Sequence, residues 1–356
     1  TSFQSNGGFT SKLFGKKFGG TFGIMYNRSF RNLDLLNRAN VIDENTYEVS
    51  IVSSYNDRKY QQEISAGALG SVSLQLNSFN KISVKSILNI NSSNSVSQRN
   101  GEDFSRQDQL KGSEFTFKQN TFFTVQANGE HRLIKPLTFK WYGAFNILDG
   151  HIPDQRRILY SKEAGTQHPY RLLISNTLSQ QSGSRIYQSL SDYIYTAGGD
   201  LSYKFKWLEQ NQTLKGGYML QVKDRLYDAK LFANYLPLDN DALRLLPADQ
   251  IFLPENFGDG TANKFAFDAI KGNTFRYLAN TILNAGFLQL DNEFTKNLRV
   301  VWGLRVENYD QLVGSVKQSD PRHTRTQVTD FLPGMNATYK INQNTNLRLS
   351  GSQTVI

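Results

Sequence analysis

The feature that most constrains this chain is a period-two alternation of apolar and polar residues, repeated over many segments. In the range 193–207 the odd positions are mostly tyrosine, leucine, phenylalanine and tryptophan, whereas the even positions include Asp200, Lys204 and Lys206. Successive side chains of a strand point to opposite faces, so this range has one apolar and one hydrophilic face as a strand. A helix of the same sequence would scatter its lysines all round. The alternation therefore predicts β-strands.

About twelve segments share this pattern. The clearest, besides 193–207, are 137–147, 214–223 and 298–307, and weaker ones are 3–13, 18–26, 64–76, 82–90, 115–127, 331–341 and 347–351. The less regular range 277–293 is interpreted as a strand too. Alternating segments of roughly ten residues are what a tilted membrane-spanning strand requires.

The links between these segments alternate between short and long. Short links lie near 14–17, 77–80, 132–136, 208–212, 295–297 and 342–345, and long ones near 32–59, 91–113, 148–192, 228–276 and 312–326. In an up-and-down barrel this order places all tight turns on one rim and all long loops on the other. Outer-membrane barrels have this asymmetry, with short periplasmic turns and long extracellular loops. Aromatic residues at the strand ends are expected at the two membrane interfaces: Tyr203, Phe205 and Trp207 at one rim, and Tyr193 and Tyr195 at the other.

Composition separates this interpretation from its alternatives. The 356 residues contain no cysteine and 20% charged residues, the mean hydropathy is −0.49, and no apolar run approaches the ~18–20 residues of a membrane helix. A soluble β-sandwich usually has strands of about 5–6 residues and short loops, and no fixed repeat suggests a propeller or solenoid. The predicted fold class is therefore all-β: an antiparallel up-and-down transmembrane β-barrel.

The net charge of +9 does not indicate nucleic-acid binding. The basic residues alternate with apolar ones along predicted strands, as Arg299 and Arg305 do, instead of forming a patch with stacking aromatic side chains. They are expected on the hydrated face that lines the lumen.

No motif for catalysis or metal binding is found. The four histidines (His131, His151, His168 and His323) lack metal-ligand spacing, and all but His131 are expected in long loops. Three aspartates of one loop lack EF-hand spacing: Asp239, Asp241 and Asp249. The run Phe257-Gly258-Asp259-Gly260 lacks the lysine of a phosphate loop, and no Gly-x-Ser-x-Gly motif supports an outer-membrane protease or lipase. We expect no enzyme activity, no cofactor and no bound metal.

Several runs in the last third of the chain resemble a known family. They are LPADQIFLPEN (246–256), AGFLQLDN (285–292), LRVVWGLRVE (298–307), DFLPGMN (330–336) and NLRLSGSQT (346–354), with Tyr277 between the first two. The series resembles the barrel of TonB-dependent outer-membrane receptors of the type abundant in Bacteroidetes. The resemblance is strongest over 246–356 and diffuse over 1–245, and its motifs describe the barrel wall and not a ligand site.

The resemblance implies a location in the bacterial outer membrane and a larger architecture. Such receptors carry a segment that engages TonB, then a plug domain, then a barrel of ~22 strands. No plug-like region precedes Phe3, no basic-then-apolar signal segment opens the chain, and no aromatic-ended strand closes it. We therefore expect residues 1–356 to form part of the barrel domain, without the plug and the C-terminal strands. The implied partners are outer-membrane lipid, the TonB complex through the plug region, and a surface lipoprotein.

The expected function is uptake of a large or scarce solute, such as a siderophore or a glycan. A passive porin and a surface adhesin barrel remain alternatives. Solute contacts are expected from the two longest loops, from aromatic residues that stack on the solute or from arginines that meet an anionic one. The candidates are Tyr160, Tyr170, Tyr187, Phe252 and Phe257, with Arg156, Arg157 and Arg171.

Overall fold

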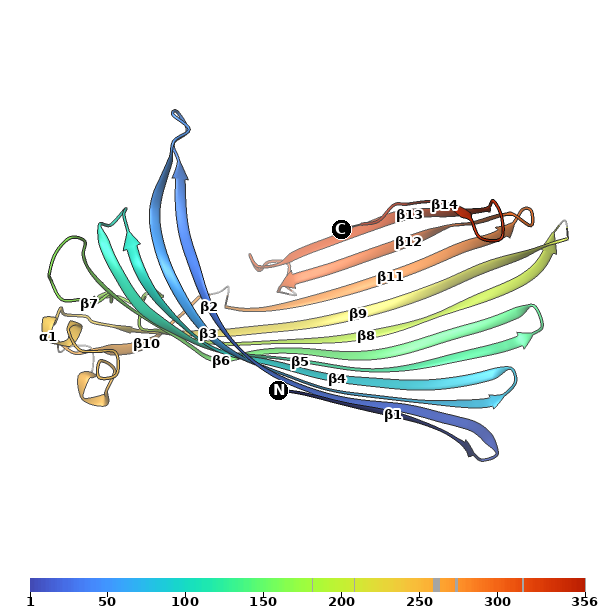
Figure 1. Ribbon diagram of the computed structural model, residues 1–356, viewed down its shortest axis with the longest axis horizontal. Coiled ribbons are helices and arrows are strands. Elements are labelled where there is room, and N and C mark those ends of the chain that lie inside the picture. Colours follow the sequence, from blue (N-terminus) through green and yellow to red (C-terminus); the bar gives the residue numbers. More distant parts are fainter. Residues whose placement is uncertain (181, 208, 259–262, 273–274, 316, 356) are drawn as a thin grey trace.

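The computed structural model describes residues 1–180, 182–207, 209–258, 263–272, 275–315 and 317–355. Within them, one antiparallel sheet has fourteen strands, and twelve of these follow one another along a single path, β1-β2-β3-β4-β5-β6-β8-β9-β11-β12-β13-β14. Two short strands lie beside this path, because β7 pairs with β6 and β10 pairs with β9. The twelve strands of the path cover the twelve predicted segments, which confirms the all-β up-and-down architecture (Figure 1).

The elements have these bounds: β1 (Ser2–Leu13), β2 (Lys16–Ile42), β3 (Val49–Asn77), β4 (Asn80–Asp103), β5 (Asp108–Ile134), β6 (Leu137–Glu163), β7 (Arg171–Leu172), β8 (Ser184–Trp207), β9 (Gln210–Tyr235), α1 (Asp241–Arg244), a 3-10 turn (Pro254–Asn256), β10 (Ala266–Ile270), β11 (Arg276–Glu293), β12 (Leu298–Gly314), β13 (Thr324–Lys340) and β14 (Asn346–Ser352). None of the helices among the described residues is long and apolar enough to cross a membrane.

The register of the strands confirms that the alternating positions form two different faces. One row of cross-strand neighbours is wholly apolar: Leu137, Tyr203, Leu214, Leu290, Trp302 and Met335. The adjacent row carries Thr138, Ser202, Lys215, Gln289 and Gly303. Directly opposed residues of a sheet lie on the same side, so we call the side of the first row the apolar face and the side of the second row the polar face.

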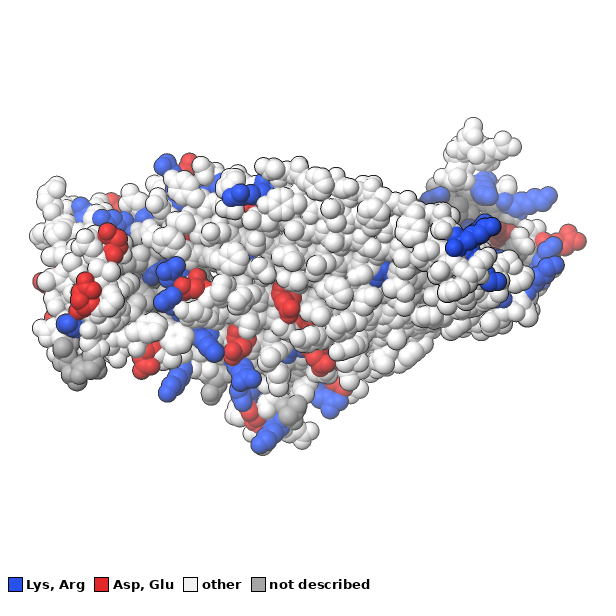
Figure 2. All heavy atoms as spheres, turned by 90° about the horizontal axis from the view of Figure 1, so that it is seen from below, with Lys and Arg blue, Asp and Glu red and all other residues white. Residues whose placement is uncertain are grey.

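The two ends of the sheet differ as predicted. The tight turns gather at one end, and β7, α1 and β10 gather at the other, which we call the outer end (Figure 1). Residue 208, in the predicted turn 208–212, lies outside the described residues. Figure 2 shows one side of the molecule, where a band with few charged side chains separates charged regions at the two ends. An uncharged band between charged rims is typical of a surface that contacts lipid.

Three of the long links, 32–59, 91–113 and 148–192, are mostly strand and are wrongly predicted as loops; in the third, β6 continues to Glu163 and β8 begins at Ser184. The range 32–59 is mostly strand, because β2 continues to Ile42 and β3 begins at Val49, and 91–113 is mostly the ends of β4 and β5. His151, Tyr160 and Tyr187 likewise lie on β6 and β8, not in a loop. Beyond the lipid both faces of a strand are hydrated, so the apolar alternation ends while the backbone ladder continues. The alternation therefore locates the membrane part of a strand but not its outer limit.

The sheet is open in the described chain, where β1 pairs only with β2 and β14 only with β13. A small hydrophobic core lies at the outer end, under the segment between β9 and β10. Its buried members are Tyr160, Leu172, Ile174, Leu236, Ile251 and Phe265. This core fixes the described residues between β9 and β10, 236–258 and 263–265, against the ends of β6 and β7, and we call these described residues the segment 236–265.

Candidate ligand sites at the outer end

The segment 236–265 owes its shape to local signals in its sequence. Asn240 caps α1, because its side-chain oxygen accepts hydrogen bonds from the backbone N–H groups of Ala242 (3.1 Å) and Leu243 (3.4 Å). Arg244 at the end of α1 donates to the carbonyl oxygens of Leu172 (3.0 Å) and Ile174 (3.2 Å). These bonds connect α1 to the chain around β7, and a 3-10 turn follows at Pro254–Asn256.

Tyr160 anchors the same segment from β6. Its side chain is 7% exposed, and its hydroxyl donates a hydrogen bond to the carbonyl oxygen of Leu246 (2.9 Å). Burial raises the pKa of Tyr160 to about 12. The hydroxyl of Tyr160 is therefore a neutral hydrogen-bond donor, and its ring packs the segment against the sheet.

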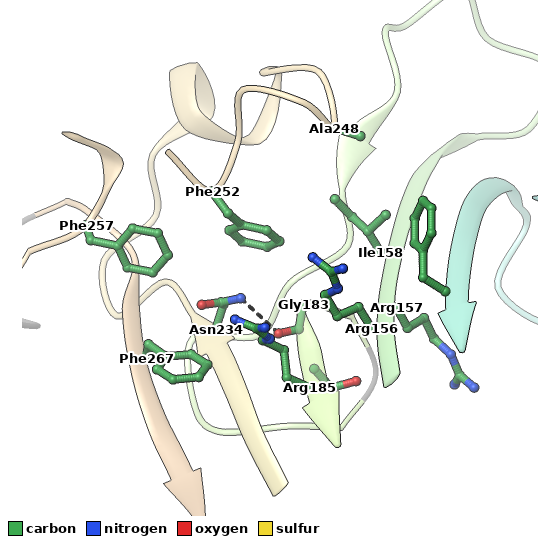
Figure 3. Close-up of a pocket in the computed structure, with 12 residues that line it drawn as sticks. Arg156, Arg157, Ile158, Gly183, Arg185, Asn234, Ala248, Phe252, Phe257 and Phe267 are labelled. Atoms are coloured by element: carbon green, nitrogen blue, oxygen red, sulfur yellow. Dashed lines mark hydrogen bonds between the residues drawn. The ribbon is translucent and has the colours of Figure 1, made fainter. Parts of the chain in front are cut away.

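A cavity of about 590 Å³ opens between this segment and the strand ends. Its lining residues are Phe115, Arg156, Arg157, Ile158, Gly183, Ser184, Arg185, Asn234, Ala248, Phe252, Phe257 and Phe267. We call it the aromatic cavity. Figure 3 shows Asn234 between the rings of Phe252 and Phe267, with Phe257 beside them and Arg185 next to Asn234.

The backbone around Gly183 shapes the floor of the aromatic cavity. Gly183 has a φ of +69°, and its carbonyl oxygen accepts hydrogen bonds from the Asn234 backbone (3.0 Å) and from Asn234 Nδ2 (3.0 Å). A Cβ atom at position 183 would lie 3.2 Å from Cζ of Phe252. Glycine at position 183 therefore permits the positive φ and leaves room for the ring of Phe252.

The arginines of the aromatic cavity differ in how they are paired. Arg156 and Arg185 are direct cross-strand neighbours, and both contact Asp154, at 3.2 Å and 2.7 Å. Arg157 instead holds Glu114 through its Nε (2.8 Å) and Nη2 (2.7 Å). The single carboxylate of Asp154 is thus shared by the guanidinium groups of Arg156 and Arg185, so the net charge of these three side chains is positive.

A second cavity, of about 250 Å³, lies closer to the β3 and β4 ends and is lined by Asp57, Ser97, Arg99, Gly112, Ser113, Glu114, Arg157 and Leu159. Arg99 donates two hydrogen bonds of 2.7 Å to the Asp57 carboxylate. Asp57 and Arg99 are placed on the polar face by the register, because β3 and β4 pair without a shift from Ser53 to Gln75. We call this the polar cavity.

The predicted contact residues are only partly brought together. Arg156, Arg157, Phe252 and Phe257 line the aromatic cavity, whereas Tyr160 belongs to the core beneath the segment. Tyr170 lies under the ammonium groups of Lys111 (4.3 Å) and Lys162 (5.2 Å). Tyr187 packs edge-on against Phe232, with ring centroids 5.7 Å apart. Arg171 pairs with Asp239 and Asp241.

Sequence reasoning missed Phe115, Arg185, Asn234 and Phe267, which are also in the lining. Phe115 stood in a predicted strand, and the others stood in ranges predicted as loop. Only the register, which pairs Phe115 with Arg156 and Arg156 with Arg185, brings them to one place.

The residues considered for metal binding have other contacts. Arg244 holds Asp239 (2.5 Å), and Asp241 pairs with Arg171. His131 accepts a hydrogen bond from Trp141 Nε1 (3.0 Å) and contacts Asn80 Oδ1 at 2.7 Å. Within the described ranges no three His, Asp or Glu side chains are grouped to hold a metal ion. Asp259 and Gly260 lie outside the described residues.

Comparison with known proteins agrees with this architecture. Residues 255–356 match the model of the outer membrane protein beta-barrel family. Among curated proteins no match is found. The match covers β10 to β14, whose strands share one register and one pair of faces with the rest of the sheet. The matched segment and the antiparallel up-and-down sheet place this chain in the bacterial outer membrane.

Proposed function

We propose that the chain forms part of the wall of a TonB-dependent transporter that takes up a large or scarce solute. The observation that carries the proposal is the twelve-strand path that is still open. Unpaired strand edges are not tolerated in lipid, so this sheet needs further pairing to complete a barrel. Barrels of about 16–18 strands leave an aqueous channel, and transporters of about 22 strands hold a plug in the lumen.

The polar face supports passage of a hydrated solute. Ion pairs follow one another along it, from Lys140–Glu130 (3.4 Å) and Lys215–Asp200 (3.3 Å) to Arg299–Asp291. At its outer end the polar cavity offers both signs of charge. A polar solute entering the lumen meets Asp57, Arg99 and Glu114 there. The resemblance of residues 246–356 to TonB-dependent receptors adds the energy coupling to this proposal.

The test is the resting conductance of the protein purified from outer membranes, in a planar bilayer with KCl. A plugged transporter is expected to show no steady conductance and to bind the purified periplasmic domain of TonB. Steady conductance without TonB binding would contradict the proposal and identify a passive porin. A protein that shows no conductance and does not bind TonB would also contradict the proposal, and would favour a surface adhesin.

A further inference from the structure

The side chains that give the aromatic cavity its chemistry, among them Phe115, Arg156 and Arg185, lie on the apolar face, whereas Arg157 and Ser184 of its lining lie on the polar face. β8 and β9 pair without a register shift from Ser184 to Trp207, so alternate residues keep one side along the whole hairpin. Arg185 therefore shares a side with Tyr193 and Tyr195, and Asn234 with Leu220 and Val222. Arg185 and Asn234 thus project from the side of the sheet that faces lipid farther down. A ligand held by Arg156 and Arg185 therefore contacts the side of the sheet that faces lipid.

The height of the cavity indicates which part of the cell surface it meets. Eight residues separate Arg185 from Tyr193 along β8, about 26 Å at ~3.3 Å per residue. Strands of such barrels are tilted by ~35–45°, so the rise above the lipid is nearer ~20 Å. The cavity therefore faces the sugar layer of the outer leaflet and lies above the acyl chains.

The chemistry of the cavity combines positive charge with flat apolar surfaces. Arg156 and Arg185 keep 60% and 39% of their side chains exposed while sharing Asp154, so both retain donors for an anion. Phe115 and Phe267 are 44% exposed, and Phe267 stacks on Phe232 with ring centroids 5.3 Å apart. Sugar rings stack on aromatic faces, and guanidinium groups bind phosphates and carboxylates in two-bond geometry.

We propose that the aromatic cavity binds the acidic saccharide of an outer-leaflet glycolipid, with Arg156 and Arg185 on its phosphate or carboxylate groups and Phe252 and Phe267 against its sugar rings. The occupant is the cell's own surface lipid and not a solute in transit. The position of Arg156 and Arg185 on the lipid-facing side argues for this source, because surface lipid is the molecule that surrounds that side of the sheet. The proposal is independent of energy coupling and holds for a transporter or a porin.

The experiment measures binding of the purified protein in detergent to lipopolysaccharide, using phosphatidylglycerol vesicles as the anionic lipid without sugar and dextran as the neutral sugar. The native protein is expected to bind lipopolysaccharide at least tenfold more tightly than either comparison probe. Binding of phosphatidylglycerol as tightly as lipopolysaccharide would reduce the cavity to a nonspecific anion patch and overturn the proposal.

Two variants locate the binding. Arg185→Gln is expected to weaken lipopolysaccharide binding about tenfold or more, because charged hydrogen bonds contribute ~1.5–3 kcal/mol. The matched control is Arg99→Gln, which removes an arginine of the polar cavity and is expected to leave the affinity unchanged. Equal losses in both variants, or no loss in Arg185→Gln, would contradict the assignment. Phe267→Leu, which keeps the charge and removes the aromatic ring, is expected to weaken binding severalfold and to exclude a purely electrostatic contact.

A third experiment distinguishes a glycolipid from a soluble sugar as the source of the acidic saccharide. The same affinities are measured with a soluble uronic-acid oligosaccharide added alone and in competition with lipopolysaccharide. Competition at the Arg185-dependent site confirms the saccharide chemistry. If the soluble sugar binds far more tightly than lipopolysaccharide, the glycolipid is the wrong source and the proposal falls.

Discussion

At the scale of single residues, Asp192 is a nearly fully buried carboxylate on the polar face. Its side chain is 2% exposed, and it holds Arg225 (2.7 Å) and Lys223 (3.0 Å) on the polar face. Both cations are about one-third exposed, so solvent screens part of the interaction. The carboxylate neutralises two neighbouring positive charges that would otherwise repel each other.

We expect Asp192→Asn to lower the free energy of unfolding by ~1–3 kcal/mol, since it leaves two cations without their shared partner. The measurement is urea unfolding of the protein in lipid vesicles. Asp34→Asn is the control, because Asp34 pairs with Arg58 and both are mostly exposed. An equal shift of the two midpoints would show that burial of Asp192 is unimportant.

Gly183 carries a second prediction at this scale. Gly183→Ala is expected to weaken packing of the segment 236–265 by ~1–2 kcal/mol, because alanine is strained at positive φ and its Cβ would meet Phe252. Faster protease cleavage within residues 236–258 would reveal the effect. Gly70→Ala provides the comparison, since a Cβ there has nothing within 4 Å. Unchanged cleavage in Gly183→Ala would refute this account of the cavity floor.

At the scale of elements, the segment 236–265 depends on a neutral tyrosine. The pKa of Tyr160 is raised to about 12 by burial, whereas a released tyrosine ionises near 10. The released form therefore loses its proton first as pH rises, and packing of the segment is expected to weaken between pH 10 and 12. Below pH 10 both forms are neutral and the Tyr160 contribution is complete.

Hydrogen exchange of residues 236–258, followed from pH 8 to 11 and corrected for intrinsic exchange rates, checks this expectation. In Tyr160→Phe the hydrogen bond to Leu246 is lost, so protection is expected to fall by a factor of about five at neutral pH. The same variant is expected to lose the pH dependence above 10. A native protein whose protection does not change with pH would contradict the role of Tyr160.

The strands show how far the sequence predicts these elements. Within the membrane, lipid on one side and water on the other impose a strict alternation, so ranges such as 193–207 and 298–307 are readable from residues alone. Beyond it that constraint disappears, and β2 and β3 continue without an apolar signal. The aromatic cavity was not predictable as a unit, because it joins Phe115, Arg185 and Phe252 through strand register and a register shift between Ile152 and Gln155.

For the whole molecule, the assignment of the two faces has a direct test on β11. Leu288 lies on the apolar face and is 58% exposed, while its neighbour Gln289 lies on the polar face. We expect Leu288→Lys to lower stability in lipid vesicles by about 2 kcal/mol, because a lysine within the membrane is costly. Gln289→Lys is expected to be tolerated. If Gln289→Lys lowers the urea midpoint more than Leu288→Lys does, the assignment of the lipid-facing and lumen-facing sides is wrong and must be reversed.

The long hairpins at the outer end have a consequence for the sheet as a whole. β3 has 29 residues, about 95 Å of chain at ~3.3 Å per residue, and a bilayer strand needs only ~9–11 residues. The β2–β3 hairpin thus extends well beyond the bilayer, and residues 43–48 form its tip. Substitutions at that tip are expected to leave the membrane part of the wall unaffected, so the tip and the lipid-facing band are free to change independently within one continuous sheet.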